Sequence, residues 1–270
     1  MFTKVFDISG KEIDNIELPA VFETPYMPEV IHRVFVHTSS GQFQRQGRYP
    51  EAGEVVSAES RNTGQGIARI ARARGEGFQR AGQAAGVGGI RHGRVAHPPM
   101  SWKKIEKKIN KKEKLLGFCS AIGATSRKDL VEERGHKLSN IESLPIVVSS
   151  EIEDITKTSR LKEILISLGL NEDLKRSEKI VRVRSGKSRM RGRKRTNALS
   201  CIIVVTKGSP ICKLTSLQGV DIRPVDDMSI LDLVPGSKPI RLTIYSKGAL
   251  EKLSELECIS NRIQNLVNQD

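Results

Sequence analysis

At 270 residues the chain has room for one large domain or two small ones, and its net charge is +14. Hydrophobic residues make up 37% of the sequence but aromatic residues only 4%, which predicts an aliphatic core smaller than the length suggests. The four cysteines are scattered without a C-x-x-C pair, so the sequence supports neither a disulfide framework nor a cysteine metal site. We predict free, buried thiols in a reducing compartment.

The N-terminal part is expected to hold two strands and a helix. The first ten residues, MFTKVFDISG, include Asp7 and predict a strand over residues 2–8 rather than a signal peptide. A second short strand is expected around residues 16–18. A helix is expected from about Pro28, because proline suits the first helical turn. The apolar residues of this helix share one face: Val30, Ile31, Val34 and Phe35.

Residues 60–97 differ from the rest of the chain. These 38 residues hold nine glycines and seven arginines, no lysine, and Glu76 as the only acid. No strand alternation runs through the stretch, and residues 67–74 are its only helix-like piece. A disordered linker would fit the glycines, but such linkers are rich in Ser, Glu, Lys and Pro. Arginines spaced by small residues favour an arm that is mobile alone and ordered within nucleic acid, reaching about 60 Å when doubled back.

The chain leaves this stretch through residues 97–99 (HPP), which predict a stiff exit. Ser101 is expected to cap a long helix over about residues 102–124. Its seven lysines between Lys103 and Lys114 suit either a solvated face or an RNA-facing surface. Trp102 is expected to be a packing anchor where the arm rejoins the body.

The second half alternates predicted strands and helices. Apolar runs predict strands, and the purest of them suits a central strand buried on both faces but is too short to cross a membrane. The strands are expected over residues 144–150, 180–183, 201–206, 220–222 and 242–246, and the helices over 161–168, 229–234 and 249–256. The alternation indicates an α/β fold, a single three-layer domain with a largely parallel central sheet and a long extended internal loop. We expect a body of residues 1–42 and 100–270, with residues 43–99 as the inserted arm.

Residues 182–195 (RVRSGKSRMRGRKR) form a second basic stretch, with eight basic residues and no acid. Gly186 and Gly192 argue against a regular helix, so we expect a loop held between two strands. This stretch carries +8 and residues 60–97 carry +6, which together account for the whole net charge. Two concentrated positive regions predict a polyanionic partner. Because aromatic residues are almost absent from them, recognition of folded RNA by shape and backbone fits better than base stacking.

Motifs for catalysis are missing from the sequence. There is no G-x-x-x-x-G-K-[ST], no H-E-x-x-H and no G-x-S-x-G, and the arm's GQGIAR and GEGFQR lack the third glycine of a dinucleotide site. Asp226 and Asp227 are adjacent acids that suit a solvated loop better than a metal site. We therefore expect no enzyme, no cofactor and no metal.

Four stretches give a resemblance that covers essentially the whole chain. They are LPAVFETPYMPEVI (18–31), the arm with its exit (59–99), RGHKL (134–138) and SGKSRMRGRKR (185–195). In this order they resemble the universal large-subunit ribosomal protein "L four" family in its archaeal and eukaryotic form. The length resembles archaeal members, and the glycine-rich arm tip resembles eukaryotic ones.

The resemblance implies a structural constituent of the large ribosomal subunit, located in the cytoplasm. Its body would bind 23S-type ribosomal RNA, and its arm tip, about residues 75–89, would line the constriction of the peptide exit tunnel. The expected partners are this RNA, neighbouring large-subunit proteins including the one opposite the tip, and the nascent polypeptide, with no membrane and no homo-oligomer. The tunnel-lining candidates are Arg74, Gly75, Gly77, Arg80 and Gln83. The RNA-binding candidates are Arg61, Arg69, Arg72, Arg91, Arg94, Arg182, Arg184, Lys187, Arg189, Arg191, Arg193, Lys194 and Arg195.

Two alternatives from other classes stay open at this point. A free RNA-binding translational regulator would have the same basic regions but would not stay on the large subunit in high salt. An RNA-processing enzyme would need convergent titratable residues at an edge of the sheet.

Overall fold

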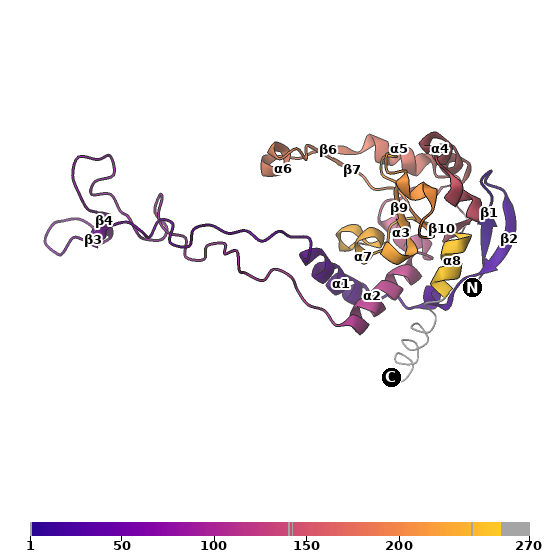
Figure 1. Cartoon of the computed structure of the whole chain (residues 1–270), viewed down its shortest axis with the longest axis horizontal. Helices are drawn as coiled ribbons and strands as arrows, with labels where there is room; N and C mark the ends of the chain where they lie inside the picture. The colour runs from indigo at the N-terminus through magenta and orange to yellow at the C-terminus, as the bar shows by residue number, and fades with distance from the viewer. Residues whose placement is uncertain (1, 140, 142, 239, 255–270) are drawn as a thin grey trace. The chain divides into compact units, whose positions relative to one another are not determined.

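A computed structural model describes residues 2–139, 141, 143–238 and 240–254 (Figure 1). The chain divides into two compact units. One unit, called the body below, holds the chain up to Ser39 and from Lys108 onward; the other, called the arm unit, is Ser40–Lys107. Residues 43–99 lie inside the arm unit, and their insertion as an arm stays a prediction. Cys258 and the end of the predicted C-terminal helix lie outside the described residues.

The body is built on a six-stranded sheet of order β2-β1-β5-β10-β8-β9. β1 pairs antiparallel with β2, and the other neighbouring pairs are all parallel. The strands are β1 (Phe2–Phe6), β2 (Glu12–Glu17), β5 (Ile146–Val148), β8 (Ile202–Val205), β9 (Asp221–Pro224) and β10 (Thr243–Ser246). This topology confirms the predicted α/β fold with a largely parallel sheet.

The middle of the sheet is covered on both faces. Every residue of β5, β8 and β10 is buried, although successive side chains of a strand point to opposite faces. Strands of this kind are typical of parallel sheets with helices on both sides. The two-sided burial predicted for residues 201–206 is therefore confirmed.

Helices and short 3₁₀ turns connect the strands. The helices are α1 (Pro28–Ser40), α2 (Lys111–Ala124), α3 (Lys128–Glu133), α4 (Thr158–Ser167), α5 (Asn171–Lys179), α6 (Gly186–Met190), α7 (Ile230–Leu233) and α8 (Lys247–Ser254). The turns are η1 (Ala20–Glu23), η2 (Ser150–Asp154), η3 (Pro210–Lys213), η4 (Val225–Asp227) and η5 (Pro235–Ser237). α1 begins at Pro28 as predicted. α5 was missed because it is mostly charged and Leu174 is its only apolar residue.

The long helix predicted over residues 102–124 begins later, at Lys111. The side-chain oxygen of Asn110 accepts a hydrogen bond from Lys112 N at 3.1 Å. Asn110 and not Ser101 is therefore the N-cap of this helix. α2 packs closely on the end of η1 at Gly123. A side chain at this position would not fit, since its Cβ would lie 2.7 Å from the Thr24 carbonyl oxygen. The prediction for Trp102 is also wrong, since this residue is 63% exposed and anchors no packing.

The arm unit contains a small sheet of its own. β3 (Ala58–Ser60) pairs antiparallel with β4 (Ala71–Ala73). On the other side of β4, Ala85 N donates to the Ala71 carbonyl and Ala73 N donates to the Gln83 carbonyl, each at 2.9 Å. The helix-like reading of residues 67–74 was therefore wrong, because the alternation of alanine with arginine in Ala71–Ala73 supports a strand.

The two ends of the arm unit run side by side. Lys107 N donates to the Ser40 hydroxyl at 2.9 Å, and Arg48 N donates to the Pro99 carbonyl at 3.2 Å. Within the unit, the outgoing and returning segments can be followed to β3 and β4 in Figure 1. The outgoing and returning segments of the arm unit are thus hydrogen-bonded to each other, and the unit is not a structureless loop.

Candidate nucleic-acid interface

Residues 181–197 form a hairpin, called the basic hairpin below. β6 (Val181–Val183) pairs antiparallel with β7 (Arg195–Asn197), and α6 lies between the two strands (Figure 1). The pairing continues beyond the strands, because Arg184 N donates to the Lys194 carbonyl at 2.8 Å. The prediction of a loop without helix is wrong in part, because the short helix α6 begins at Gly186 and ends before Gly192. β7 was missed because Arg-Thr-Asn shows no apolar alternation.

The charges of the basic hairpin are not neutralised from within. Within the described residues, none of its eight basic side chains forms an ion pair with a carboxylate. Arg184 is half-buried and its Nε donates to the Thr196 hydroxyl, and the other seven residues are exposed. These seven are Arg182, Lys187, Arg189, Arg191, Arg193, Lys194 and Arg195. Concentrated, exposed cations of this kind attract a polyanion.

The five RNA-binding candidates of the arm unit fall into two groups. Arg61, Arg69, Arg91 and Arg94 are exposed, and Arg94 lies 3.9 Å from Glu54 in a weak ion pair. Arg72 is half-buried, and its Nη1 donates to the Gly82 carbonyl at 3.0 Å. The Nε of Arg72 is buried and has no hydrogen-bond partner among the described residues. Arg72 therefore holds the turn at Gly82 with part of its guanidinium, which the sequence did not suggest.

Three of the five predicted tip residues lie around one pocket. Arg74, Arg80 and Gln83 line a cavity of about 190 Å³ together with Phe78. Arg74 forms an ion pair with Glu59, and Arg80 Nη2 donates to the carbonyl of Arg91, another lining residue, at 3.3 Å.

The other two predicted tip residues, Gly75 and Gly77, lie on an exposed turn between Arg74 and Arg80. Their φ angles are +99° and +80°, which glycine adopts without strain. The structure thus supplies a physical reason for glycine at both positions.

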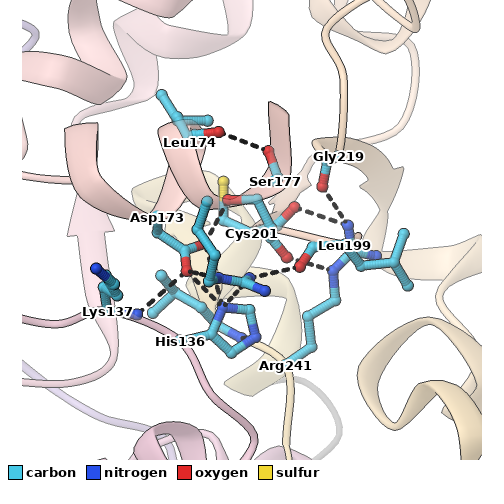
Figure 2. Close-up of polar contacts among 12 residues, drawn as sticks. His136, Lys137, Asp173, Leu174, Ser177, Leu199, Cys201, Gly219 and Arg241 are labelled. Atoms are coloured by element: carbon cyan, nitrogen blue, oxygen red, sulfur yellow. Dashed lines mark hydrogen bonds and ion pairs between the residues drawn. The ribbon is translucent and has the colours of Figure 1, made fainter. Parts of the chain in front are cut away.

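A buried polar network, drawn in Figure 2, lies in the body at RGHKL (134–138). The carboxylate of Asp173, 0% exposed, accepts hydrogen bonds from His136 Nδ1 at 3.2 Å, Arg176 Nε at 2.8 Å and Ser200 Oγ at 2.5 Å. Burial by itself would raise the pKa of Asp173, but the hydrogen bonds from His136 and Arg176 outweigh it and hold this pKa below its usual value. Asp173 is therefore an ionised carboxylate at the centre of the network.

The same network fixes the protonation of His136. The Leu242 N–H donates to His136 Nε2 at 3.4 Å, which leaves the proton on Nδ1, facing Asp173. Burial lowers the pKa of His136, and Arg176 and Arg134 act in the same direction, against the attraction of Asp173. Serine, histidine and aspartate meet here, yet Ser200 donates to Asp173 and not to His136, so the geometry lacks the serine–histidine bond of a nucleophilic site.

Arg241 extends this network to the N-terminal ends of β8 and β9, and sequence analysis missed it. Although only 1% exposed, its guanidinium donates to the carbonyls of Ser200, Cys201 and Gly219 at 2.6–3.0 Å and to Asp221 at 2.5 Å. Figure 2 shows Arg241 beside Gly219 and Cys201. The only signal in the sequence was a single arginine placed directly before the apolar run of β10.

The carboxyl edge of the sheet, where α/β enzymes usually bind ligands, holds Glu153. Its oxygens accept hydrogen bonds from Thr206, Ser209 at 2.9 Å and Ser246 at 2.5 Å. Burial opposes ionisation, but these hydroxyls and the Thr206 N–H lower the pKa of Glu153 below its usual value. The carboxylate thus joins the ends of β8 and β10, and its hydrogen-bonding capacity is already occupied.

The described cysteines and acidic residues form neither a reactive thiol site nor a metal site. Cys119 and Cys201 are free and buried as predicted, and burial raises their pKa to about 11 and about 12, which keeps both thiols protonated. Cys212 is free and half-buried. No cluster of three metal-ligating side chains occurs in the part of the chain that the structure describes. Across these same ranges, no helix combines the length and apolar character that spanning a bilayer requires.

Comparison with known proteins extends these observations to the whole chain. Residues 16–256 match the Ribosomal protein L4/L1 family. Three relatives, each named large ribosomal subunit protein uL4, come from Haloquadratum walsbyi (39% identical, covering 94% of this chain and 100% of the relative), Methanococcus vannielii (37%, 94% and 99%) and Sulfurisphaera tokodaii (38%, 93% and 93%). These matches confirm the resemblance given by the four sequence stretches. The chain belongs to the Ribosomal protein L4/L1 family, a family of ribosomal proteins and not of enzymes.

Proposed function

We propose that this protein is a structural constituent of the large ribosomal subunit in the cytoplasm. The relatives named as large-subunit proteins are covered over 93–100% of their own length, so the likeness extends to body and arm unit alike. Its partners would then be large-subunit ribosomal RNA and neighbouring proteins of that subunit.

The basic hairpin carries this proposal. Its eight cations form no ion pair with a carboxylate among the described residues, so their charge is free to bind an anion. The guanidinium group of arginine can donate two hydrogen bonds to the two free oxygens of one phosphate. Because β6 and β7 are hydrogen-bonded to each other, the charges are held in a fixed register. Arg182 and Arg184, two positions apart, share one face of the ribbon, so they would contact successive phosphates of one strand.

The arm unit would contact the same RNA and the exit tunnel. We propose that the exposed Arg61, Arg69, Arg91 and Arg94 bind phosphates along the two legs, with Arg72 contributing from its half-buried position. The tip, with Arg74, Gly75, Gly77, Arg80 and Gln83, would line the tunnel constriction opposite another ribosomal protein and face the nascent polypeptide. The family resemblance is the support for this assignment, together with the grouping of three of these residues around one pocket.

Sedimentation of a native lysate in a sucrose gradient after a high-salt wash tests the proposal, with an antibody to this chain as the readout. We expect the protein to stay in the large-subunit peak, because an arm enclosed by folded RNA cannot leave by exchange of counterions alone. Release into the soluble fractions would overturn the proposal and favour the free regulator.

A further inference from the structure

The body contains a second basic feature, remote in sequence from the hairpin and the arm unit. It is an open pocket of about 660 Å³, called the Arg134 pocket below. Its lining includes Tyr26, Glu133, Arg134, His136, Arg176 and Lys238. These residues come from the chain before α1, the end of α3, α5 and the segment after η5, so the fold assembles the site from four separate segments.

Two guanidinium groups of this pocket are held in place by hydrogen bonds to backbone carbonyls and, for Arg176, also to the Asp173 carboxylate. Arg134 donates to the Pro235 carbonyl at 3.1 Å and to the Lys238 carbonyl at 3.4 Å. Arg176 donates to Asp173 through Nε and to the Leu199 carbonyl through Nη2, each at 2.8 Å. The Nη1 of Arg176 has no hydrogen-bond partner within the ranges that the structure describes. Both groups are thus fixed before any ligand arrives, which lowers the entropic cost of binding.

Positive charge is in excess around this pocket. Arg134, Arg176 and the exposed Lys238 line it, and Glu133 is the one carboxylate that lines it in the described part of the chain. Asp173 lies behind Arg176, but its oxygens already accept from His136, Ser200 and the Lys137 N–H. The cations also act on one another, because burial first and then the charges of Arg241 and Arg176 lower the pKa of Arg134. A bound anion would relieve this repulsion.

The turn that positions Arg134 is under backbone strain. Gly236 and Ser237 have φ angles of +77° and +60°, and the second value is uncommon for a residue with a side chain. The Ser237 hydroxyl is hydrogen-bonded to His32 Nδ1 at 2.6 Å, which holds the turn against α1. Strain of this kind is kept where a segment has to present particular groups. Here the groups are the carbonyls of Pro235 and Lys238 that orient Arg134.

We propose that the Arg134 pocket binds one phosphate group of an RNA backbone, as a third contact besides the basic hairpin and the arm unit. The inference rests on the proposed function for the presence of RNA. A phosphodiester offers two unesterified oxygens, which suit the Arg134 and Arg176 guanidiniums, with Lys238 as a third donor at the rim. Glu133 and Lys238 are exposed at the rim of the pocket, which leaves room for the RNA strand to enter and leave. A free phosphate ion has the same chemistry, and the experiment separates the two sources.

The first arm of the experiment uses inorganic phosphate and the full-length protein, with thermal melting at constant ionic strength as the readout. Lys238→Gln and Glu133→Gln change exposed side chains that form no ion pair with a described residue, so both variants are expected to fold. We expect Lys238→Gln to weaken phosphate binding about fivefold and Glu133→Gln to strengthen it by about as much. Lys207→Gln and Glu151→Gln, exposed and outside the pocket lining, are the charge-matched controls and should change nothing.

The second arm measures binding of the same variants to a large-subunit ribosomal RNA fragment as a function of salt. If one phosphate enters the pocket, Lys238→Gln should flatten the slope of log K against log salt by up to about 0.9, more than Lys207→Gln does. Saturating RNA should also abolish the stabilisation by inorganic phosphate, because both ligands compete for one site. Opposite effects of Lys238→Gln and Glu133→Gln in both arms would establish the site.

Other outcomes overturn the inference. Phosphate binding that responds to the pocket variants while RNA binding does not would mean a site for a free anion only. No response of either ligand would mean that the pocket binds no phosphate. If RNA binding is lost with a basic hairpin variant but insensitive to Lys238→Gln, only this inference fails. If the wild-type protein itself binds no RNA, the proposed function fails, and this inference fails with it.

Discussion

Arginine has opposite surroundings in two regions of the body. Arg241 is 1% exposed and directs its donors at three carbonyls and Asp221. Arg189, Arg191 and Arg193 of the basic hairpin are exposed and form no ion pair with a described carboxylate. The guanidinium of Arg241 thus has its hydrogen-bond partners inside the fold, whereas the hairpin arginines are available to a binding partner.

This contrast separates stability from binding. A buried cation whose partners are all internal contributes to the fold, and removing it leaves those partners unsatisfied. An exposed cluster without partners contributes repulsion to the isolated protein and attraction to a polyanion. Substitutions in the two regions should therefore affect different measurements.

The largest expected effect is on stability, from Arg241→Ala. It should lower the free energy of unfolding by about 3–5 kcal/mol, because Asp221 and three carbonyls lose their donor in or near the core. Urea denaturation followed by circular dichroism measures this change. Arg223→Ala is the control: this half-exposed arginine lies 3.4 Å from Asp232 and its loss should cost less than about 1 kcal/mol. Equal effects of the two substitutions would break the comparison.

The next effect is on RNA binding, from replacing Arg189, Arg191 and Arg193 with alanine together. The salt slope of RNA binding should flatten by up to about three phosphate equivalents, while the free energy of unfolding changes by no more than about 0.5 kcal/mol. Salt titrations of RNA binding and urea denaturation give the two numbers. A matched variant with Arg160, Lys175 and Lys207 replaced removes the same charge from exposed positions elsewhere on the body. An unchanged slope in the hairpin variant would mean that the hairpin faces solvent.

The pH dependence of stability tests the buried network around His136 and Asp173. Because the folded protein lowers the pKa of His136 from its ordinary 6.5, the unfolded chain takes up a proton more readily below that pH. The free energy of unfolding should therefore fall as the pH drops from about 7 to about 5. Asp173, whose pKa is also lowered, contributes stability that is lost at still lower pH, below its ordinary 3.8.

Urea denaturation between pH 7.5 and pH 5 measures this dependence, with His136→Asn as the test and the exposed His97→Asn as the control. The His136 variant should show a flatter pH profile than the control. A wild-type protein that becomes more stable on acidification would mean that His136 gains a proton and pairs with Asp173.

The smallest effect is expected from deleting residues 75–89. Among the described residues, none of the hydrophobic core cluster comes from the arm unit, so the free energy of unfolding of the body should change by no more than about 0.5 kcal/mol. Calorimetry of the deletion variant next to the full chain measures this. Unfolding of the body on deletion would show that the arm unit supports the core.

Much of the fold could be predicted from apolar patterning. The runs around β5, β8 and β10 are short, almost purely apolar and buried on both faces, so they were recognisable as central strands. Elements defined by polar or small residues were missed, such as α5 and the Ala-Arg-Ala strand β4. β4 depends on pairing with β3, which local propensity does not encode, and α5 has Leu174 as its only apolar residue and so shows no apolar stripe.

The candidate interface could be predicted in composition but not in geometry. The eight charges of residues 182–195 were evident, whereas the pairing of β6 with β7 was not, because Arg195–Asn197 carries no apolar pattern. The Arg134 pocket could not be predicted at all. Its cations come from positions as far apart as 134 and 238, and only the folded chain brings them to one lining.

The strand order has a consequence for how the body can be made. β10 is the last strand along the described chain, yet it lies in the middle of the sheet, between β5 and β8. Until Thr243–Ser246 has been synthesised, β5 and β8 each keep an unpaired, apolar edge, which is a hazard for aggregation. We expect body folding to wait for this strand, so that the two basic regions leave the synthesising ribosome before the sheet that supports them is closed.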